Sequence, residues 1–333
     1  MRKLAVKLIV FLIVFQLTTP AFGWGNTGHR TVGQIAQSRL ANTNTLLRIQ
    51  GILRPNETLS SIANWADTVK NERNFDPPAP NSDPDTQDFY QHLVNQHNRV
   101  WHFVDLALDC TGYGDPRCKK FTSRTDIVQI INLCIRRLRG DPVANNAPRL
   151  TKRNALRMLV HLVGDLHQPL HVGVGFVNAD DPGNIVIVRD PDSILQNNFP
   201  SDLGGNNLLI ANEVSDNLHS FWDSDLVDAA RGTQSIVAFS NSLVNQISPA
   251  PDWNATGNFN TWAAQWAGDT LRISNANAYD QTIKLMKEVI IDNRTKYTTE
   301  KGPSYKNDNI PVVKLQLAKG GYRLAQLLRA ILP

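Results

Sequence analysis

The sequence lacks a hydrophobic run long enough to span a bilayer. Its longest apolar stretch, residues 8–17, is about half the length that a spanning helix needs. This stretch follows a basic segment (residues 2–7) and precedes a small-residue end at Gly23, which is the pattern of a removable signal peptide. We therefore expect cleavage of residues 1–23, a mature chain that begins at Trp24 without a membrane anchor, and a secreted or periplasmic protein.

An excess of charge of one sign is also missing. The whole chain has 34 Lys and Arg against 30 Asp and Glu, and three of the basic residues lie in the leader, which has no acid. The mature chain therefore has a net charge of 31 minus 30, or +1. This near balance excludes a general basic surface that coats phosphates. If the substrate is a nucleic acid, its binding must come from a local site.

Strand signals are scarce, since only residues 184–188 and 207–210 have a strand-like pattern. Apolar residues instead recur every three or four positions, which predicts helices. The predicted helices cover residues 32–41, 59–71, 125–139, 152–166, 213–229, 234–247, 259–274, 277–292 and 312–331. Residues 140–148 and 172–206 are expected to be loops. The simplest fold is one all-α domain over residues 24–333, with at most a small hairpin.

Cysteine is rare, with three residues in the chain. Cys110 and Cys118 flank a turn segment rich in Gly, Pro and Asp, which favours a short-loop disulfide in an oxidising compartment. Cys134 lies in an apolar helical run and is expected to be a buried thiol. Three glycosylation sequons, which matter only if the host glycosylates secreted proteins, begin at Asn56, Asn254 and Asn293.

Histidine is scarce as well, but most of the eight histidines stand in short motifs beside Asp or Trp. His161 and Asp165 are four positions apart and would project from one face of a helix. A proline then ends that helix, which lets His171 fold back, and His219 and Asp223 repeat the four-residue spacing. Imidazole and carboxylate one helical turn apart can share a divalent ion. One such pair is usually a solvated salt bridge, but two pairs and a third histidine favour a metal site.

Three further segments contribute candidate ligands. Asp67 lies on an amphipathic helix, where a surface charge alone would be the simpler interpretation. His102 stands among apolar residues, as a hydrogen-bonded core histidine often does. Cleavage before Trp24 would expose an α-amine and a carbonyl oxygen that can chelate a metal through a five-membered ring, and His29 could complete that site.

Together these motifs resemble the S1/P1 nuclease family, whose all-α trinuclear zinc fold is shared with bacterial zinc phospholipase C. The matching pieces occur in family order and are WGNTGHR (24–30), NWAD (64–67), WHFVDL (101–106), HLVGDLHQPLH (161–171), GGNNL (204–208), DNLHSFWD (216–223) and AKGGYRLAQLL (318–328). The resemblance covers nearly the whole mature chain, and all nine ligand positions hold the expected residue type.

The resemblance implies three Zn²⁺ ions. The first would be held by Asp67, His102, His161 and Asp165, the second by the amine and carbonyl of Trp24 with His29 and Asp165, and the third by His171, His219 and Asp223. Asp165 would bridge the first two ions and be the central catalytic ligand. His92, His97 and His167 fall outside the pattern and are expected to be surface or supporting residues.

The resemblance also implies the activity. The enzyme would hydrolyse phosphodiester bonds of single-stranded DNA and RNA to 5′-phosphate products, with a zinc-bound water as nucleophile and with 3′-nucleotidase activity on nucleotides. Phe103 would stack on a base, and Asp105 would accept hydrogen bonds from its edge. Stacking of roughly 1–3 kcal/mol per base is available only to unpaired bases. Simple core packing is the alternative role of Phe103. We expect a monomer.

Two other functions remain open at this stage. A zinc-dependent phospholipase C shares the implied fold, but the last ligand is Asp223 here, where the phospholipases look more Glu-like. A non-catalytic zinc-binding secreted protein would bind metal without turnover. The connection over residues 172–203 is longer than in fungal members of the family, and it is equally compatible with a lid or substrate wall and with a neutral surface loop.

Overall fold

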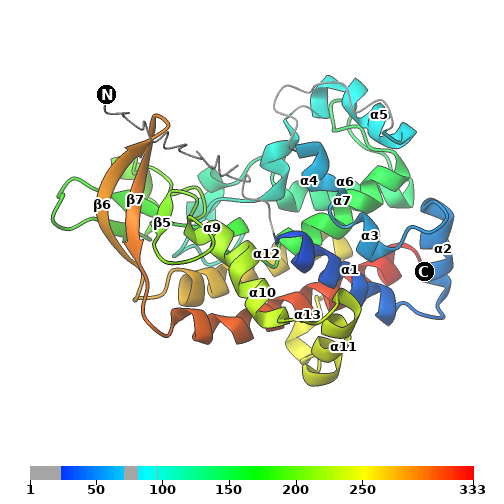
Figure 1. Ribbon diagram of the computed structural model, residues 1–333. Helices are drawn as coiled ribbons and strands as arrows, with labels where there is room; N and C mark the ends of the chain where they lie inside the picture. Colours follow the sequence, from blue (N-terminus) through cyan, green and yellow to red (C-terminus); the bar gives the residue numbers. More distant parts are fainter. Residues whose placement is uncertain (1–23, 71–81, 96) are drawn as a thin grey trace, which may run out of the picture.

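Three helices form the centre of the computed structural model. The long C-terminal helix α13 (Tyr305–Ile331) packs against α1 (Asn26–Arg39), and both pack against α7 (Lys152–Asp165) (Figure 1). The structure describes residues 24–70, 82–95 and 97–333. The expected signal peptide therefore lies outside the described residues. None of the helices within these ranges has the length and apolar character needed to cross a membrane.

Shorter helices surround this centre. They are α2 (Asn44–Ile52), α3 (Leu59–Ile62), α4 (Trp65–Lys70), α5 (Pro84–Gln91), α6 (Ile127–Arg139), α8 (Pro191–Asn197), α9 (Leu218–Ser220), α10 (Leu226–Arg231), α11 (Ile236–Gln246) and α12 (Trp262–Ile273). Local signals set the helix ends. Asp126 caps α6 by accepting hydrogen bonds from Val128 N and Gln129 N, and Gly140 ends it in the left-handed region at φ 79°.

Irregular helical turns carry several of the candidate ligands. The 3-10 turn η2 (Asn98–His102) ends at the candidate ligand His102, and η4 (Pro169–His171), which follows α7 closely, ends at the candidate ligand His171. A π-turn, η5 (Phe221–Asp225), joins α9 to α10, and a second one, η8 (Ser274–Ala278), extends α12. Such π-turns are frequent at functional sites.

The strands form three small sheets. β1 (Leu106–Ala107) pairs in parallel with β2 (Gly173–Val174), and β3 (Phe176–Asn178) pairs in antiparallel fashion with β4 (Val186–Val188). The third sheet has the order β5-β7-β6, built from β5 (Leu208–Ile210), β6 (Lys284–Ile291) and β7 (Arg294–Glu300). It stands at the end of the molecule opposite α2 (Figure 1). The mainly helical fold class predicted from the sequence is confirmed.

The helix predicted over residues 277–292 is wrong, because this segment contains β6. Leu285, Met286, Val289 and Ile290 have helix-like spacing, but the two residues after the end of β6, at 292 and 293, have positive φ and turn the chain into β7. A turn of this kind joins two strands of a hairpin. The β-branched run that precedes the turn and the turn itself were the signals for a hairpin.

Other element boundaries also differ from the expectation. The predicted loop over 172–206 contains β2, β3, β4 and α8, so the long connection is a folded subdomain. The helix expected from residue 213 begins only at Leu218, because the side chain of Asn217 caps it there. The last helix begins at Tyr305 rather than at 312 and accommodates Pro311 in its interior.

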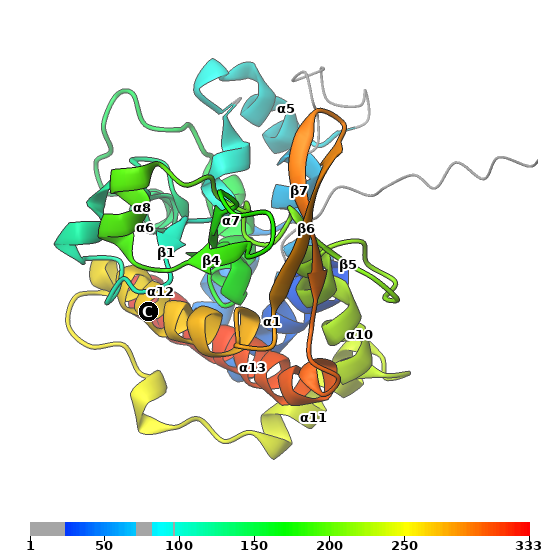
Figure 2. The ribbon, with the colours of Figure 1, turned by 90° about the vertical axis from the view of Figure 1, so that its left-hand side faces the viewer.

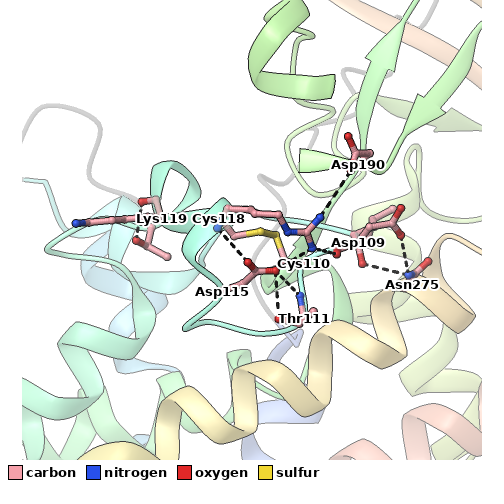
Figure 3. The surroundings of a disulfide bond; sticks show 11 residues. Asp109, Cys110, Thr111, Asp115, Cys118, Lys119, Asp190 and Asn275 are labelled. Atoms are coloured by element: carbon pink, nitrogen blue, oxygen red, sulfur yellow. Dashed lines mark hydrogen bonds and ion pairs between the residues drawn. A yellow bond between two sulfur atoms is a disulfide. The ribbon is translucent and has the colours of Figure 1, made fainter. Parts of the chain in front are cut away.

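The predicted disulfide between Cys110 and Cys118 is present, and Cys134 is a buried free thiol as expected. The Asp115 carboxylate orders the enclosed turn, because it accepts hydrogen bonds from Thr111 N at 2.9 Å and from Arg117 N at 3.0 Å (Figure 3). The disulfide loop therefore has its own hydrogen-bond network.

Candidate metal centre

Asp165 lies at the middle of a fully buried cluster of histidines. Its Oδ1 is 3.2 Å from His29 Nε2, and its Oδ2 is 3.0 Å from His102 Nδ1 and 3.1 Å from His161 Nε2. His161 comes from the preceding turn of α7, whereas His29 comes from α1 and His102 from η2. Asp67 of α4 joins them, with Oδ1 3.5 Å from His161 Nε2. Side chains from four segments that are distant in the sequence, α1, α4, η2 and α7, therefore meet in one cluster.

A second cluster lies beside the first. His219 Nε2 is 3.3 Å from Asp223 Oδ2, across the π-turn, and the rings of His219 and His171 are 5.0 Å apart. His171, His219 and Asp223 form a group whose ligand atoms all lie within 4.8 Å of one another. Two overlapping groups meet the same limit in the first cluster, namely His29 with Asp67 and His161, and His102 with His161 and Asp165.

Backbone carbonyls orient three of the histidines. Nδ1 of His161 lies 2.7 Å from Ala63 O, Nδ1 of His171 2.7 Å from His102 O, and Nδ1 of His219 2.7 Å from Gly204 O. When Nδ1–H donates to these oxygens, the tautomer is fixed and the Nε2 lone pair points into the cluster. Ligating histidines in metal sites are usually held in this way.

Several buried polar atoms of the two clusters have no hydrogen bond of ordinary geometry among the described residues. They are both ring nitrogens of His29, Nε2 of His102 and of His171, Oδ1 of Asp165, and Oδ2 of Asp223. Buried polar atoms are rarely left in this state unless an ion or a water satisfies them. Mixed imidazole and carboxylate donors suit zinc, so the residues fit such ions.

Burial and neighbouring charges set the protonation of these groups. Burial lowers the pKa of His29 to about 4 and that of His102 and His219 to about 3. Burial also opposes the charged form of His161, but the carboxylates of Asp165 and Asp67 outweigh it and raise the His161 pKa to about 10. Most of the imidazoles are therefore neutral and ready to bind metal, whereas His161 must release a proton first.

Trp24 is fully buried at the start of the described chain. Gly25 N donates a hydrogen bond to Asp223 O at 2.9 Å, which ties this end of the chain to the second cluster. A Cβ on Gly28 would lie 2.7 Å from Trp24 Cβ, so the helix accepts Trp24 only because residue 28 is glycine. Trp24 therefore has a defined place next to the clusters.

Phe103 and Asp105 follow His102 in an extended segment that runs beside His171. Val104 N donates to His171 O at 2.9 Å, and Val104 is buried. Side chains alternate along an extended chain, so Phe103 and Asp105 share the opposite side, where both are partly exposed. Burial raises the pKa of Asp105 to about 6. The two residues thus lie together next to the second cluster.

Comparison with known proteins matches residues 24–333 to the model of the family described as S1/P1 Nuclease. The chain belongs to the S1/P1 nuclease family. It is similar to Nuclease S1 of Aspergillus oryzae, with 28% identity over 96% of this chain and 94% of that protein. It is also similar to Nuclease P1 of Penicillium citrinum, with 27% identity over 92% of this chain and 97% of that protein. Endonuclease 4 of Arabidopsis thaliana is 25% identical over 96% of this chain and 93% of that protein. The protein is therefore a nuclease, and this family is metal-dependent.

Two residues next to the clusters of this nuclease were not identified from the sequence. Gln168 is buried, and its Nε2 donates to Asp223 Oδ1 at 2.6 Å. Lys70 Nζ lies 2.8 Å from Asp67 Oδ1, three residues away on α4. Gln168 lies inside the HQPLH motif between two candidate ligands, and this position was the available signal for a role beside the clusters. Lys70 has a one-turn spacing from Asp67, but this spacing is common on solvated helices.

A third residue that the sequence analysis missed is Asp202. It is fully buried before the two glycines of the GGNNL motif, and its Oδ1 accepts hydrogen bonds from Gly205 N and Tyr279 Oη, both at 3.0 Å. Burial raises the pKa of Asp202 to about 7. Gly204 O, in the same loop, accepts the hydrogen bond from His219. Asp202 thus anchors the loop that orients a histidine of the second cluster.

Two of the remaining histidines lie at the surface or close to it. His97 is exposed, and His92 is partly exposed beside Asp88. His167 is not a surface residue, because it is fully buried against α13, with Nε2 3.3 Å from Arg323 Nη1. It belongs to the packing of α7 on α13 and to none of the metal-binding groups.

Proposed function

We propose that this nuclease uses three zinc ions to hydrolyse phosphodiester bonds of single-stranded DNA and RNA, and leaves 5′-phosphates. Residues 24–333 would form one catalytic domain that also acts as a 3′-nucleotidase. One observation carries the proposal: imidazole nitrogens and carboxylate oxygens meet in buried groups that lie next to one another. Several of these atoms have no hydrogen bond. The same chain segments carry the motifs of a family of nucleases.

Nine residues would hold the ions. Asp67, His102, His161 and Asp165 would bind the first, Trp24, His29 and Asp165 the second, and His171, His219 and Asp223 the third. Bound zinc would lower the pKa of a coordinated water towards 7 and stabilise negative charge on phosphoryl oxygens. Asp165 supports a bridging role because its two oxygens face different histidines, Oδ1 facing His29 and Oδ2 facing His102 and His161.

Selectivity for unpaired strands would come from Phe103 and Asp105. Their shared, partly exposed side next to His171 supports a pocket that accepts one base close to the scissile phosphate. The ring of Phe103 would stack on the base, and the Asp105 carboxylate would accept hydrogen bonds from base N–H groups. A base within a duplex cannot enter such a pocket without leaving its stack, so paired strands would react slowly.

Export would be coupled to metal binding. The α-amine of Trp24 exists only after removal of residues 1–23, so the second zinc site would be complete only in the exported protein. The burial of Trp24 beside Asp223 supports this role. A form with one extra residue before Trp24 should bind less zinc per chain and lose most activity. Full zinc content and activity in that form would refute the terminal ligand.

Hydrolysis of several substrates by the mature protein tests the function itself. We expect rapid release of acid-soluble nucleotides from denatured DNA and from RNA, slow release from duplex DNA, and phosphate release from 3′-nucleotides. Phosphatidylcholine is the comparison substrate. Release of phosphocholine without release of nucleotides would identify a phospholipase C, and three bound ions without any turnover would identify a non-catalytic zinc protein.

A further inference from the structure

The β6–β7 hairpin presents two chemically different faces. Directly paired residues of an antiparallel ladder point to the same side, and the side alternates along each strand. The pairs Leu285–Thr299 and Glu288–Tyr297 therefore share one face, with Ile290–Thr295 beyond them. The other face carries the pairs Lys287–Thr298, Val289–Lys296 and Ile291–Arg294. We call this second face, defined by Lys287, Val289, Ile291, Arg294, Lys296 and Thr298, the basic face.

The first face is turned towards the folded connection that contains β3 and α8. Glu288, Thr295 and Tyr297 line one hollow together with Phe199 and other residues of that connection. Figure 2 shows the hairpin standing beside the segment that contains β4 and α8. The basic face is the opposite side of the same ribbon, so it is turned away from the connection.

All three cations of the basic face are without partners among the described residues. Lys287, Arg294 and Lys296 form no ion pair and no side-chain hydrogen bond there, whereas the nearby Lys301 and Lys306 both pair with Glu213. Beyond the basic face, at the root of the hairpin, the pair Lys284–Glu300 lies on the same side and adds one charge of each sign. A chain in which 34 basic and 30 acidic residues nearly balance thus places three unpaired cations on one side of one ribbon.

The middle of β7 is joined to the loop that orients a histidine of the candidate metal centre. Tyr297 N donates to Asn207 O at 2.8 Å, and β7 pairs with β5 directly after the loop whose Gly204 O holds His219. The eight residues of β6 then extend roughly 26 Å at about 3.3 Å per residue. The basic face therefore belongs to a ribbon whose middle is joined, through β5 and the glycine loop, to a histidine of the second cluster.

We propose that the basic face of the β6–β7 hairpin binds phosphates of the nucleic-acid strand beyond the scissile bond. This inference rests on the proposed function, since it assumes that a single strand is cut at the candidate metal centre. Phosphates of a bound strand are the anions that would meet this face, and Val289 and Ile291 would contact sugars or bases between the cations. The face would hold long substrates in place, and a dinucleotide would be too short to reach it.

The test removes the three cations in one variant, Lys287→Ala/Arg294→Ala/Lys296→Ala. Its matched control, Arg48→Ala/Arg136→Ala/Lys152→Ala, removes the same charge from exposed positions without ion pairs. Arg48 lies on α2, at the other end of the molecule from the hairpin (Figure 1). Lys152 opens α7 more than two turns before His161, and Arg136 lies in the last turn of α6.

Binding is measured as the salt dependence of the Kd for a long labelled oligothymidylate with hydrolysis-resistant phosphorothioate linkages. Each phosphate contact to a single strand contributes about 0.7 to the slope of log Kd against log salt concentration. The hairpin variant, which lacks three cations, should therefore lose about 2 from that slope. Its KM for unmodified oligothymidylate should rise, while its kcat and its kinetics on the thymidine dinucleotide stay unchanged. The control variant should keep the wild-type slope.

Three outcomes would overturn the inference. They are an unchanged slope in the hairpin variant, an equal loss of slope in the control variant, and an equal loss of activity on the dinucleotide. The proposed function is judged separately on the wild-type enzyme. Absence of hydrolysis of either substrate by the zinc-loaded wild type would reject the proposed function, whereas the binding slope still decides whether the basic face contacts the strand.

Discussion

His29 Nε2 lies 3.2 Å from Oδ1 of Asp165, and both side chains are fully buried. The contact joins α1 to the end of α7. Together with His161, which stacks on His29 with ring centroids 3.7 Å apart, it brings three ionisable groups into one small volume. Such a cluster is costly to bury unless metal ions or protons balance its charge.

The first prediction concerns Asp165→Asn, which keeps the shape of the side chain and removes its charge. Because Asp165 faces both His29 and His102, we expect the variant to lose two of the three zinc ions that we propose. Activity should fall by more than the roughly 10–100-fold that loss of a group supporting a ligand costs. Zinc per chain and kcat/KM on denatured DNA are the measurements. The exposed Asp228→Asn is the control, and an Asp165→Asn enzyme with full zinc content would contradict a bridging role.

The second prediction concerns two glycines that both lie in helices. A Cβ at Gly164 would lie 2.8 Å from His29 Nδ1, whereas a Cβ at Gly51 would meet nothing within 4 Å. Gly164→Ala should therefore displace His29 and lower zinc content and activity. Gly51→Ala should leave both unchanged and stabilise the protein by about 0.5–1 kcal/mol, because alanine is the better helix former. Equal zinc content and activity in the two variants would contradict the close packing of His29 on α7.

The third prediction concerns Asp202 and pH. Because burial raises the pKa of Asp202 to about 7, the folded protein keeps a proton that the unfolded chain releases above its ordinary pKa near 4. The contribution of this group to stability is therefore fully present below about pH 4 and is lost as the pH rises to about 7. The loss amounts to roughly 4 kcal/mol for the full shift.

Asp202→Asn should remove this pH dependence. Denaturant unfolding of the zinc-saturated wild type and variant at about pH 5 and about pH 8 measures the difference. The free energy of unfolding should fall more steeply with pH in the wild type than in the variant, and Asp228→Asn should behave like the wild type. Parallel pH profiles of wild type and Asp202→Asn would show that Asp202 is ionised in the folded protein throughout this range.

The fourth prediction concerns the disulfide. Cys110 and Cys118 are separated by eight positions, and closing so short a loop in the unfolded chain contributes about 2–3 kcal/mol. The variant Cys110→Ser/Cys118→Ser should lose about that much free energy of unfolding and keep its zinc. Reductant should destabilise the wild type and leave the variant unaffected. Wild-type stability that does not respond to full reduction would contradict this account.

The helices that were predicted well are determined by residues within the same segment of the chain. For α6 and α7, the apolar period and the capping residues Asp126 and Thr151 lie in the segment that folds, so the pattern was sufficient. The hairpin β6–β7 was missed because Leu285, Met286, Val289 and Ile290 follow a helical spacing as well. The β-branched run and the turn at residues 292 and 293 favoured the hairpin, and its pairing with β5, which is far away in the sequence, stabilises that structure.

The sequence by itself determined the family, the mainly helical fold and the short disulfide loop, because motif residues, helical period and turn signals are local properties of the chain. It also indicated which His and Asp residues to consider as ligands. Only the tertiary structure decided how His29, Asp67 and His102 are placed around α7, that Asp202 is buried behind the glycine loop, and that three cations share one face of a hairpin. These relationships depend on packing and strand pairing between distant segments, and no local pattern of residues specifies them.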